Sequence, residues 1–260
     1  MPGPISGTKE WSVQSVNILR GCSHNCRYCY ARQMACRFKQ IGSPDQWRRP
    51  VLKEHEVRKR RRRVEGTIMF PSTHDITPEF LGPCLEVIGK ILEAGNRLLI
   101  VSKPHLECIE AVCRQFGPYR EDVLFRFTIG ATDDRILGYW EPEAPTFSQR
   151  LASLRHAQQC GFQTSVSVEP MLDSQHIVEL FESVEPYVTH TVWIGKLNGI
   201  ESRVIAGTDP EEIQRIKAGQ TDERIRAIHG RLKDKPKIRW KESCKRVIGL
   251  PLAESAGLDI

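Results

Sequence analysis

Short apolar runs alternate with longer amphipathic segments along most of the chain. Strands are predicted where apolar residues run together or alternate with polar ones over a few positions. Six segments have this pattern: 13–19, 67–70, 97–102, 123–130, 163–170 and 190–195. Helical spacing of apolar residues predicts the helices 79–94, 105–116, 148–160 and 174–184, and helical segments across 209–233. Residues 237–241 are a candidate last strand.

Strands that alternate with helices of this length are typical of parallel β-α units. Six units are fewer than the eight that close a full barrel. The sequence therefore predicts an α/β fold, a partial (β/α)6 TIM-type barrel, with a doubly wound sheet as the alternative. We assign residues 1–208 to the barrel and 209–260 to a helical and strand extension packed on it. Residues 40–66 lack periodicity and are predicted to be irregular.

Polar residues follow the predicted strands, at the edge where either architecture places its ligand site. They include a cysteine-rich stretch at 21–30 and the polar stretch 72–75. The others are Ser102, Lys103, Thr128, Gly130, Thr132, Glu169, Pro170, Lys196 and Asn198. This recurrence predicts a polar ligand site across the mouth of the barrel.

The composition, with 40% apolar and 27% charged residues, is that of a globular protein. No apolar run approaches the ~20 residues that span a bilayer, and the first residues lack the apolar stretch of a signal peptide. We therefore expect a cytoplasmic protein that makes no membrane contact. The net charge is +6, and the run Arg58–Arg63 (RKRRRR) holds six cations. Such a run suits nucleic-acid phosphates, or it is a solvated surface.

Nine cysteines in a cytoplasmic chain argue against a disulfide framework. Three of them, Cys22, Cys26 and Cys29, have the spacing Cys-x3-Cys-x2-Cys directly after the first predicted strand. The remaining six have no ligand spacing, so we expect free thiols that pack as small apolar residues. These are Cys36, Cys84, Cys108, Cys113, Cys160 and Cys244.

Three thiolates are one short of the four ligands that a structural zinc or a ferredoxin cluster requires. His24 lies inside the x3 gap, where it would reach a shared metal only with strain. The alternative to an enzyme is a non-catalytic zinc or iron-sulfur module that binds nucleic acid beside the basic run.

The stretch GCSHNCRYCYA (21–31) resembles the signature of the radical S-adenosylmethionine superfamily. The resemblance implies that Cys22, Cys26 and Cys29 hold a [4Fe-4S] cluster whose fourth iron binds S-adenosylmethionine. It implies reductive cleavage to a 5′-deoxyadenosyl radical that takes hydrogen from the substrate, with the protein positioning the reactants. It also implies a one-electron reductant of the flavodoxin or ferredoxin type. Tyr28 would flank the adenine.

Residues 15–170 are similar to the spore photoproduct lyases and the related group labelled DNA repair photolyases, most clearly over 125–162. This similarity implies that cofactor contacts come from Thr73, His74, Asp75, Lys103 and Thr128. Lys103 would hold the carboxylate of S-adenosylmethionine, and the stretch around Asp75 its amino group. In the alternative interpretation, Lys103 is a surface residue. His74 and Asp75 would then form an N-cap arrangement for the helix that starts near Thr77.

Two positions depart from the lyase pattern. Ser72 stands where the lyases have the cysteine that returns hydrogen to the product radical, and a serine O–H bond is too strong for that role. Repair by the lyases' own route is therefore not expected, and the substrate is unidentified, with nucleic acid as a candidate class. Glu169 stands where the lyases are apolar, which makes it a candidate catalytic residue in contact with substrate. Its alternative is an ion pair with a nearby cation.

Overall fold

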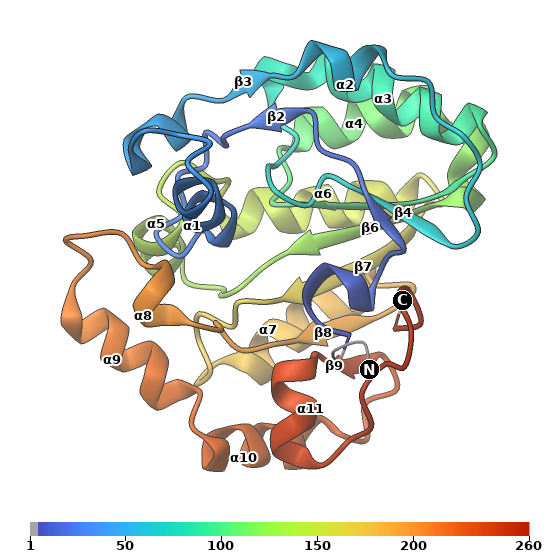
Figure 1. Cartoon of the computed structure of the whole chain (residues 1–260). Helices are drawn as coiled ribbons and strands as arrows, with labels where there is room; N and C mark the ends of the chain where they lie inside the picture. The colour runs from blue at the N-terminus through green and yellow to red at the C-terminus, as the bar shows by residue number, and fades with distance from the viewer. Residues whose placement is uncertain (1–4, 260) are drawn as a thin grey trace.

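The computed structural model describes residues 5–259 and contains a seven-stranded parallel sheet (Figure 1). Its strands are β1 (Gln14–Ser15), β4 (Thr67–Phe70), β5 (Arg97–Ser102), β6 (Val123–Thr128), β7 (Gln163–Val168), β8 (Val192–Ile194) and β9 (Ile238–Trp240). They lie side by side in chain order. The two remaining strands, β2 (Leu19–Arg20) and β3 (Val51–Leu52), form an antiparallel pair outside the sheet.

Eleven α-helices connect or extend these strands within the described residues. They are α1 (Tyr30–Arg37), α2 (Glu54–Arg58), α3 (Leu81–Glu93), α4 (Leu106–Phe116), α5 (Asp134–Trp140), α6 (Phe147–Gln159), α7 (Ile177–Val184), α8 (Ile200–Arg203), α9 (Pro210–Gly219), α10 (Asp222–Leu232) and α11 (Glu242–Ile248). None of them is long and apolar enough to cross a membrane.

Side chains alternate between the two faces of the sheet, as the period of a strand requires. Ile68 and Phe70 of β4 pack in the large core with the helices, whereas Met69 lies in a separate cluster on the opposite face. β6 repeats this pattern: Phe125 packs in the large core with the helices, and Leu124 lies in the cluster on the opposite face. The connecting helices thus cover one face, and the sequential strand order has no reversal point. The partial barrel is confirmed, and the doubly wound alternative is wrong.

The candidate strand at 237–241 joins the sheet as β9, beside β8. The predicted strand 13–19 is wrong in its extent, because only β1 pairs with the sheet. Beyond it the chain turns away: the Asn17 side chain binds the backbone of 72–73, and the Ile18 backbone N–H donates to His74. The domain boundary at residue 208 stays a prediction.

Five helices lie where the sequence predicted none: α1, α2, α5, α8 and α11. α2 lies within the stretch 40–66 that was predicted to be irregular. α5 occupies the polar loop after β6; Asp133 accepts a hydrogen bond from the Arg135 backbone at its N-terminus, and Leu137 and Trp140 are buried. α1 follows the cysteine loop directly. In Figure 1 α1 and α5 gather with α8 at the left, beside the carboxyl ends of the strands. The helical segments predicted across 209–233 are α9 and α10.

Candidate functional site

The cysteine stretch forms a loop that leads into α1 at the carboxyl edge of the sheet. Cys22 and Cys26 are buried, and Cys29 is the N-cap residue of α1, where its sulfur accepts a hydrogen bond from the Arg32 backbone. The buried Arg32 guanidinium donates to the carbonyls of Cys26 and Arg27 at 2.9 and 2.8 Å. Arg32 therefore holds the cysteine loop in place through its backbone carbonyls, a role that the sequence did not indicate.

One cavity of about 600 Å³ opens beside the three cysteines. All the residues predicted to be catalytic, to bind the cofactor or to bind metal line it, although they come from four different strand ends and the cysteine loop. They are Cys22, Cys26, Cys29, Tyr28, Thr73, His74, Asp75, Lys103, Thr128 and Glu169. The structure thus brings together every residue with a predicted role, while the roles themselves stay predictions. Of the other polar residues at the strand ends, Ser102, Gly130 and Thr132 do not line this cavity.

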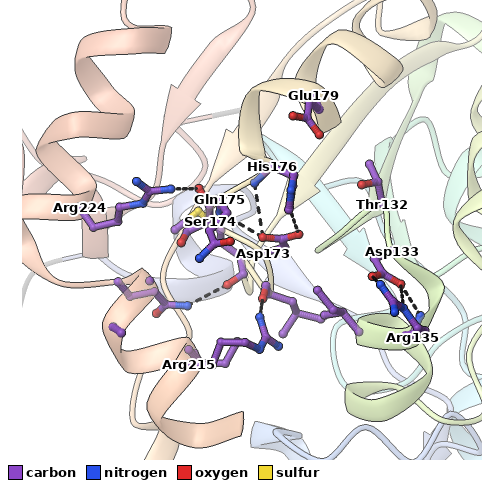
Figure 2. Close-up of a pocket in the computed structure, with 17 residues that line it drawn as sticks. Thr132, Asp133, Arg135, Asp173, Ser174, Gln175, His176, Glu179, Arg215 and Arg224 are labelled. Atoms are coloured by element: carbon purple, nitrogen blue, oxygen red, sulfur yellow. Dashed lines mark hydrogen bonds and ion pairs between the residues drawn. The ribbon is translucent and has the colours of Figure 1, made fainter. Parts of the chain in front are cut away.

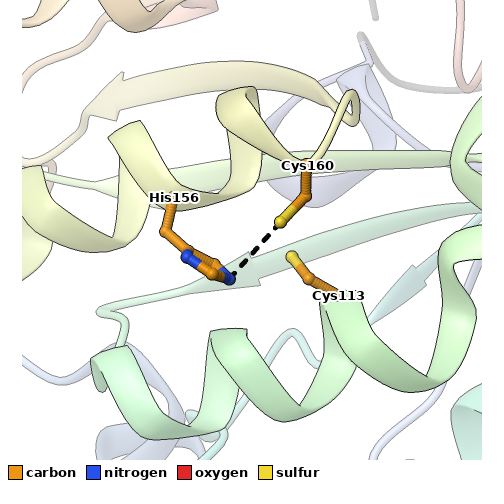
Figure 3. A group of neighbouring side chains, drawn as sticks. All are labelled: Cys113, His156 and Cys160. Atoms are coloured by element: carbon orange, nitrogen blue, oxygen red, sulfur yellow. Dashed lines mark hydrogen bonds between the residues drawn. The ribbon is translucent and has the colours of Figure 1, made fainter.

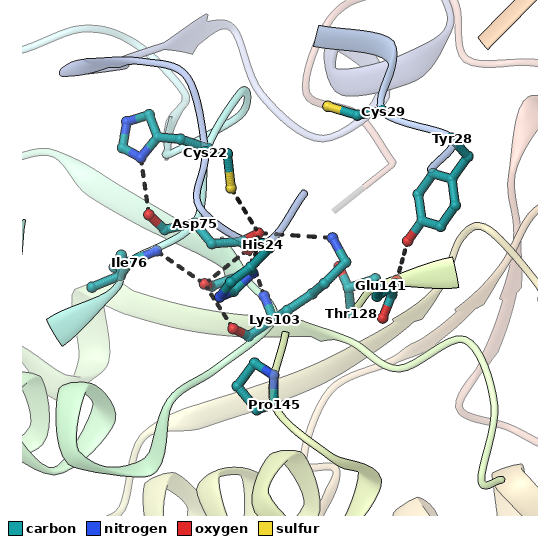
Figure 4. A network of polar contacts seen from close by, with 12 residues as sticks. Cys22, His24, Tyr28, Cys29, Asp75, Ile76, Lys103, Thr128, Glu141 and Pro145 are labelled. Carbon is teal, nitrogen blue, oxygen red and sulfur yellow. Dashed lines mark hydrogen bonds and ion pairs between the residues drawn. The ribbon is translucent and has the colours of Figure 1, made fainter. Parts of the chain in front are cut away.

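Asp75 is the centre of the polar network in this cavity (Figure 4). One of its carboxylate oxygens accepts the Lys103 backbone N–H at 2.6 Å and the Ser102 hydroxyl at 3.0 Å. Its other oxygen lies 3.8 Å from the Lys103 ammonium. Burial alone would raise the pKa of Asp75, but Lys103 and His24 outweigh it and hold this pKa well below its usual range. Asp75 is therefore an anion, and it does not cap a helix.

Lys103 is largely buried, with only 13% of its side chain exposed. Burial disfavours its charge, but the anionic groups around it, led by Asp75, raise its pKa well above the usual range. The ammonium lies 5.9 Å from the centre of the Tyr28 ring. Its distance to Asp75 is longer than a hydrogen bond, so the cation retains capacity for a further anionic partner. The surface interpretation of Lys103 is therefore wrong.

His24 is engaged on both ring nitrogens. Nδ1 lies 2.8 Å from Asp75, and Nε2 lies 2.8 Å from Nε2 of His105. The Asp75 carboxylate accepts from Nδ1 of His24, and one of the two Nε2 atoms carries the proton of the contact between the histidines. Ligand atoms of Cys22, His24 and Asp75 also lie within 4.8 Å of one another, so the exclusion of His24 as a metal ligand stays a prediction.

Tyr28 rests on a buried ion pair that the sequence did not reveal. Its hydroxyl donates to Glu141, and Glu141 pairs with Arg150 at 2.6 Å. Both charged side chains are inaccessible to solvent. Burial would raise the pKa of Glu141, but Arg150 and Lys103 outweigh it and lower that pKa. The pair fixes the Tyr28 ring against Trp140 at the wall of the cavity.

Asn17 holds the loop that carries Ser72 and Thr73. Its side-chain oxygen accepts both backbone N–H groups, at 2.8 and 2.9 Å, and its nitrogen donates to the Ser72 hydroxyl. Ser72 and Thr73 thus face the cavity in fixed positions. Cys36 and Cys84 do not line this cavity, so neither takes the place of the cysteine that the lyases have at the position of Ser72.

His74 is neutral and joins two segments of the site. Its Nε2 accepts the Ile18 backbone N–H at 3.1 Å, so Nδ1 carries the proton and donates to the Asp75 carbonyl at 3.0 Å. Burial lowers the pKa of His74 to about 4. These bonds give His74 a structural role in addition to any contact with a ligand.

We expect His74 to make the metal-free protein sensitive to mild acid. Unfolded chains protonate histidine near its ordinary pKa of 6.5, whereas the folded protein resists until about 4, so stability is full above 6.5 and falls below it. On going from pH 7 to pH 4.5, His74 should therefore lower the free energy of unfolding by about 2 kcal/mol. Chemical denaturation at both pH values measures this fall, which should be smaller by about 2 kcal/mol in His74→Gln than in the wild type. An equal fall in the two proteins would contradict the assignment of a buried neutral His74.

The N-terminal segment forms a further wall of the cavity. Residues 6–9 and Trp11 line it, and the buried Lys241 ammonium lies 3.8 Å from the centre of the Trp11 ring. Lys241 also pairs with Glu10 at 2.9 Å and with Glu169 at 3.5 Å. Glu169 thus faces the cavity, as a residue in contact with substrate would, and also pairs with Lys241, as the alternative interpretation of an ion pair with a nearby cation expected.

A second hollow, of about 870 Å³, lies between α5, the loop after β7 and the α9–α10 pair (Figure 2). Its charged groups mostly engage one another or the backbone: Asp173 contacts His176 at 2.7 Å, and Arg224 donates to the Ser174 carbonyl. It contains none of the cysteines and, of the polar residues predicted at the strand ends, only Thr132. The cavity at the cysteine loop is therefore the stronger candidate site.

Comparisons with known proteins agree with this geometry. A sequence model of the Radical SAM superfamily matches residues 16–184, more than half of the chain. Among curated proteins, Uncharacterized protein ORF301 of Acidianus two-tailed virus is 26% identical over 176 residues. The match covers 64% of this chain and 58% of the viral protein, so the chain spans less than two thirds of that relative.

Two solved structures share the fold. A spore photoproduct lyase variant with bound AdoMet and dinucleoside spore photoproduct has a TM-score of 0.52 and 16% identity, covering 87% of this chain and 75% of the lyase. SuiB of Streptococcus suis, bound to the precursor peptide SuiA, has a TM-score of 0.51 and 8% identity, covering 92% of this chain and 51% of SuiB. At these identities the likeness establishes the architecture alone.

Proposed function

Because the chain belongs to the radical SAM superfamily, we propose that it binds a [4Fe-4S] cluster through Cys22, Cys26 and Cys29 and cleaves S-adenosylmethionine reductively. The observation that carries the proposal is the cavity that these cysteines share with Lys103 and Asp75. When bound, the cluster supplies one electron that breaks the bond from sulfur to C5′, and the resulting 5′-deoxyadenosyl radical takes hydrogen from the substrate.

The arrangement of the sulfur atoms suits a cluster better than a single zinc ion. A tetrahedral zinc with Zn–S bonds of about 2.3 Å holds its thiolates about 3.8 Å apart. Within the described residues, the three sulfurs of Cys22, Cys26 and Cys29 do not form a set lying within 4.8 Å of one another. Ligands that bind three different irons need this wider separation. The spacing supports the cluster over the zinc module.

The polar groups of the cavity complement the amino-acid end of S-adenosylmethionine. The Lys103 ammonium suits its carboxylate, and the Asp75 carboxylate suits its amino group. Tyr28, fixed by Glu141, offers an aromatic face for the adenine. The volume of the cavity falls within the range of sites for small molecules and cofactors. Burial of these charges would exclude water from the reacting groups.

Replacing Lys103 with methionine should weaken S-adenosylmethionine binding without loss of the cluster. A charge-assisted hydrogen bond contributes ~1.5–3 kcal/mol, so we expect the dissociation constant to rise about 10- to 100-fold. Equilibrium binding to the reconstituted protein measures the change, and Lys233→Met, at an exposed position outside the cavity, is the control. Equal affinities of the two variants would contradict the assignment of Lys103.

Metal analysis of anaerobically purified protein tests the proposal against the zinc module. We compare the wild type with Cys26→Ser and ask which metal is lost. Loss of four irons together with sulfide supports the enzyme, and a change in the electron paramagnetic resonance of the reduced cluster on adding S-adenosylmethionine supports cofactor binding. Loss of one zinc, with no sulfide in either protein, would establish the module instead.

We also propose a one-electron reductant of the flavodoxin or ferredoxin type as a partner, because reductive cleavage of S-adenosylmethionine consumes one electron. For the substrate, nucleic acid is the class favoured by the basic run and by the dinucleoside bound to the related lyase. With Ser72 in the cavity, a product radical would need a hydrogen donor other than the cysteine of the lyases.

The basic run offers a separate test of nucleic-acid contact. Arg58, Lys59 and Arg61 pair with Glu54 or Glu56. The exposed Arg60, Arg62 and Arg63 have no carboxylate within 4.0 Å in the described part of the chain. Arg63 approaches β4 at the edge opposite the cavity. This position suits binding of a duplex flank better than recognition of the reacting base.

Changing these three free arginines to serine should reduce the salt dependence of duplex binding. Each lost phosphate contact lowers the slope of log K against log salt by about 0.9. A control variant with three serines near α10 should keep the slope of the wild type; the replaced cations are Arg226, Arg231 and Lys233. An unchanged slope in the first variant would assign the run to solvent.

A further inference from the structure

Three potential metal ligands meet on the helices outside the barrel, remote in sequence from the cysteine loop (Figure 3). Cys113 lies in the last turn of α4, His156 in the last turn of α6, and Cys160 directly after α6. Their sulfur and nitrogen atoms all lie within 4.8 Å of one another. This group corrects the expectation that the scattered cysteines have no ligand partners, and Cys160 is exposed, not buried.

The packing of two helices creates this group. His156 and Cys160 are four residues apart, so they lie above one another on the same face of α6. α4 packs against this face and places Cys113 opposite them. None of the three residues lines the cavity at the cysteine loop. Since both helices end near the start of the next strand, the group lies toward the amino edge of the sheet, away from the candidate active site.

The separation between Cys160 and His156 matches that of a tetrahedral zinc ion, and the sulfur of Cys113 lies within 4.8 Å of both ligand atoms. Bonds of about 2.3 Å to sulfur and about 2.0 Å to nitrogen place a thiolate and an imidazole about 3.5 Å apart, and two thiolates about 3.8 Å apart. Cys160 Sγ lies 3.4 Å from His156 Nε2. A thiol–imidazole hydrogen bond would explain this one contact, but it would not explain the convergence of Cys113 on the same point.

We propose that Cys113, His156 and Cys160 bind one Zn²⁺ ion, which joins α4 to α6. Two thiolates and an imidazole are a ligand set that zinc prefers. Because Cys160 is exposed and His156 is half-buried, solvent can reach the group and water can supply the fourth ligand. Cys22, Cys26 and Cys29 do not form such a group with one another in the described residues, although Cys22 lies within 4.8 Å of His24 and Asp75.

The test uses the full-length protein with its iron-sulfur cluster reconstituted, so that Cys22, Cys26 and Cys29 are occupied. Zinc chloride is added under reducing conditions, and its affinity is measured by competition with a chromophoric chelator. We expect one zinc per chain in the wild type. Cys160→Ser and His156→Gln should each weaken zinc binding more than about 100-fold. Replacing a residue that only hydrogen-bonds to a metal ligand typically weakens binding by about 10- to 100-fold. Cys36→Ser, which changes an isolated cysteine, should bind like the wild type.

Thermal unfolding gives a second readout that does not depend on enzyme activity. Zinc that binds only the folded state should raise the melting temperature of the wild type and of Cys36→Ser, but not that of Cys160→Ser. Because Cys160 is exposed, its replacement should leave the fold intact without zinc.

Three results would overturn the proposal. One is a wild type that binds no zinc although its thiols are reduced. Another is unchanged zinc affinity in both Cys160→Ser and His156→Gln. The third is zinc that displaces iron, which would place it at the cysteine loop. None of these outcomes depends on whether S-adenosylmethionine is cleaved.

Discussion

Replacing Cys26 with serine is expected to abolish the formation of 5′-deoxyadenosine and to remove the bound iron. Cys26 is buried and faces the cavity, so no neighbouring side chain can replace its sulfur without moving the loop. A serine hydroxyl is a much poorer ligand for iron-sulfur clusters, which are held by thiolates. Iron and sulfide analysis, together with chromatography of the products, measures both losses.

Cys36→Ser is the matched control for this experiment. Cys36 lies in α1, one turn and a half beyond the cysteine loop, and does not line the cavity. This variant should retain the iron content and the product yield of the wild type. If Cys26→Ser kept its iron and still formed 5′-deoxyadenosine, the assignment of the three cysteines would be wrong.

Replacing Arg150 with methionine is expected to lower the free energy of unfolding by about 3–5 kcal/mol, because it leaves Glu141 as a buried charge without its main partner. The pair is inaccessible to solvent, which makes the desolvation cost large. Denaturant titration of the metal-free protein measures the loss. The double variant Glu141→Gln and Arg150→Met removes both charges and should recover a large part of it.

An exposed ion pair provides the comparison. Lys217 contacts Glu201 at 2.6 Å, but both side chains are largely open to solvent. Lys217→Met should therefore cost less than about 1 kcal/mol. A loss in Arg150→Met no greater than in Lys217→Met would contradict the role of the buried pair. Failure of the double variant to recover stability would show that Arg150 acts mainly through its bonds to backbone carbonyls.

The sequence was most informative where local patterns decide the structure. Apolar periodicity placed the strands from 67–70 onward and the helices between them, because each buried strand and each amphipathic helix has a pattern of its own. The polar residues after the strands were then correctly expected at one edge, since parallel strands end together. This is why Lys103, Thr128 and Glu169 could be placed in one cavity before the fold was known.

Tertiary contacts were invisible to this reasoning. Glu141 and Arg150 are distant from Tyr28 in sequence, and nothing in their local pattern indicated a buried ion pair. The wall formed by Trp11 and Lys241 joins the two ends of the chain, so no local spacing could reveal it. Similarly, Cys113 is separated from Cys160 by 47 residues, and only the packing of α4 on α6 brings them together.

Local pattern also misled where side chains compete with the sheet. The alternation in 13–19 is that of a strand, but Asn17 and Ile18 bond to the loop after β4 and draw the chain away. α5 was missed because its seven residues are too few for a clear helical period. In both cases the departure builds the site: the first positions Ser72, and the second supports Tyr28 through Trp140 and Glu141.

The most direct test of the central claim is product analysis after anaerobic reduction of the reconstituted protein with S-adenosylmethionine. Lys103 and Asp75 share a cavity with the three cysteines that we propose as cluster ligands, so we predict that 5′-deoxyadenosine and methionine form in equal amounts. Candidate nucleic-acid substrates are included in parallel reactions. A protein that holds an intact four-iron cluster but forms neither product, with or without these substrates, would contradict the claim that this chain is a radical S-adenosylmethionine enzyme.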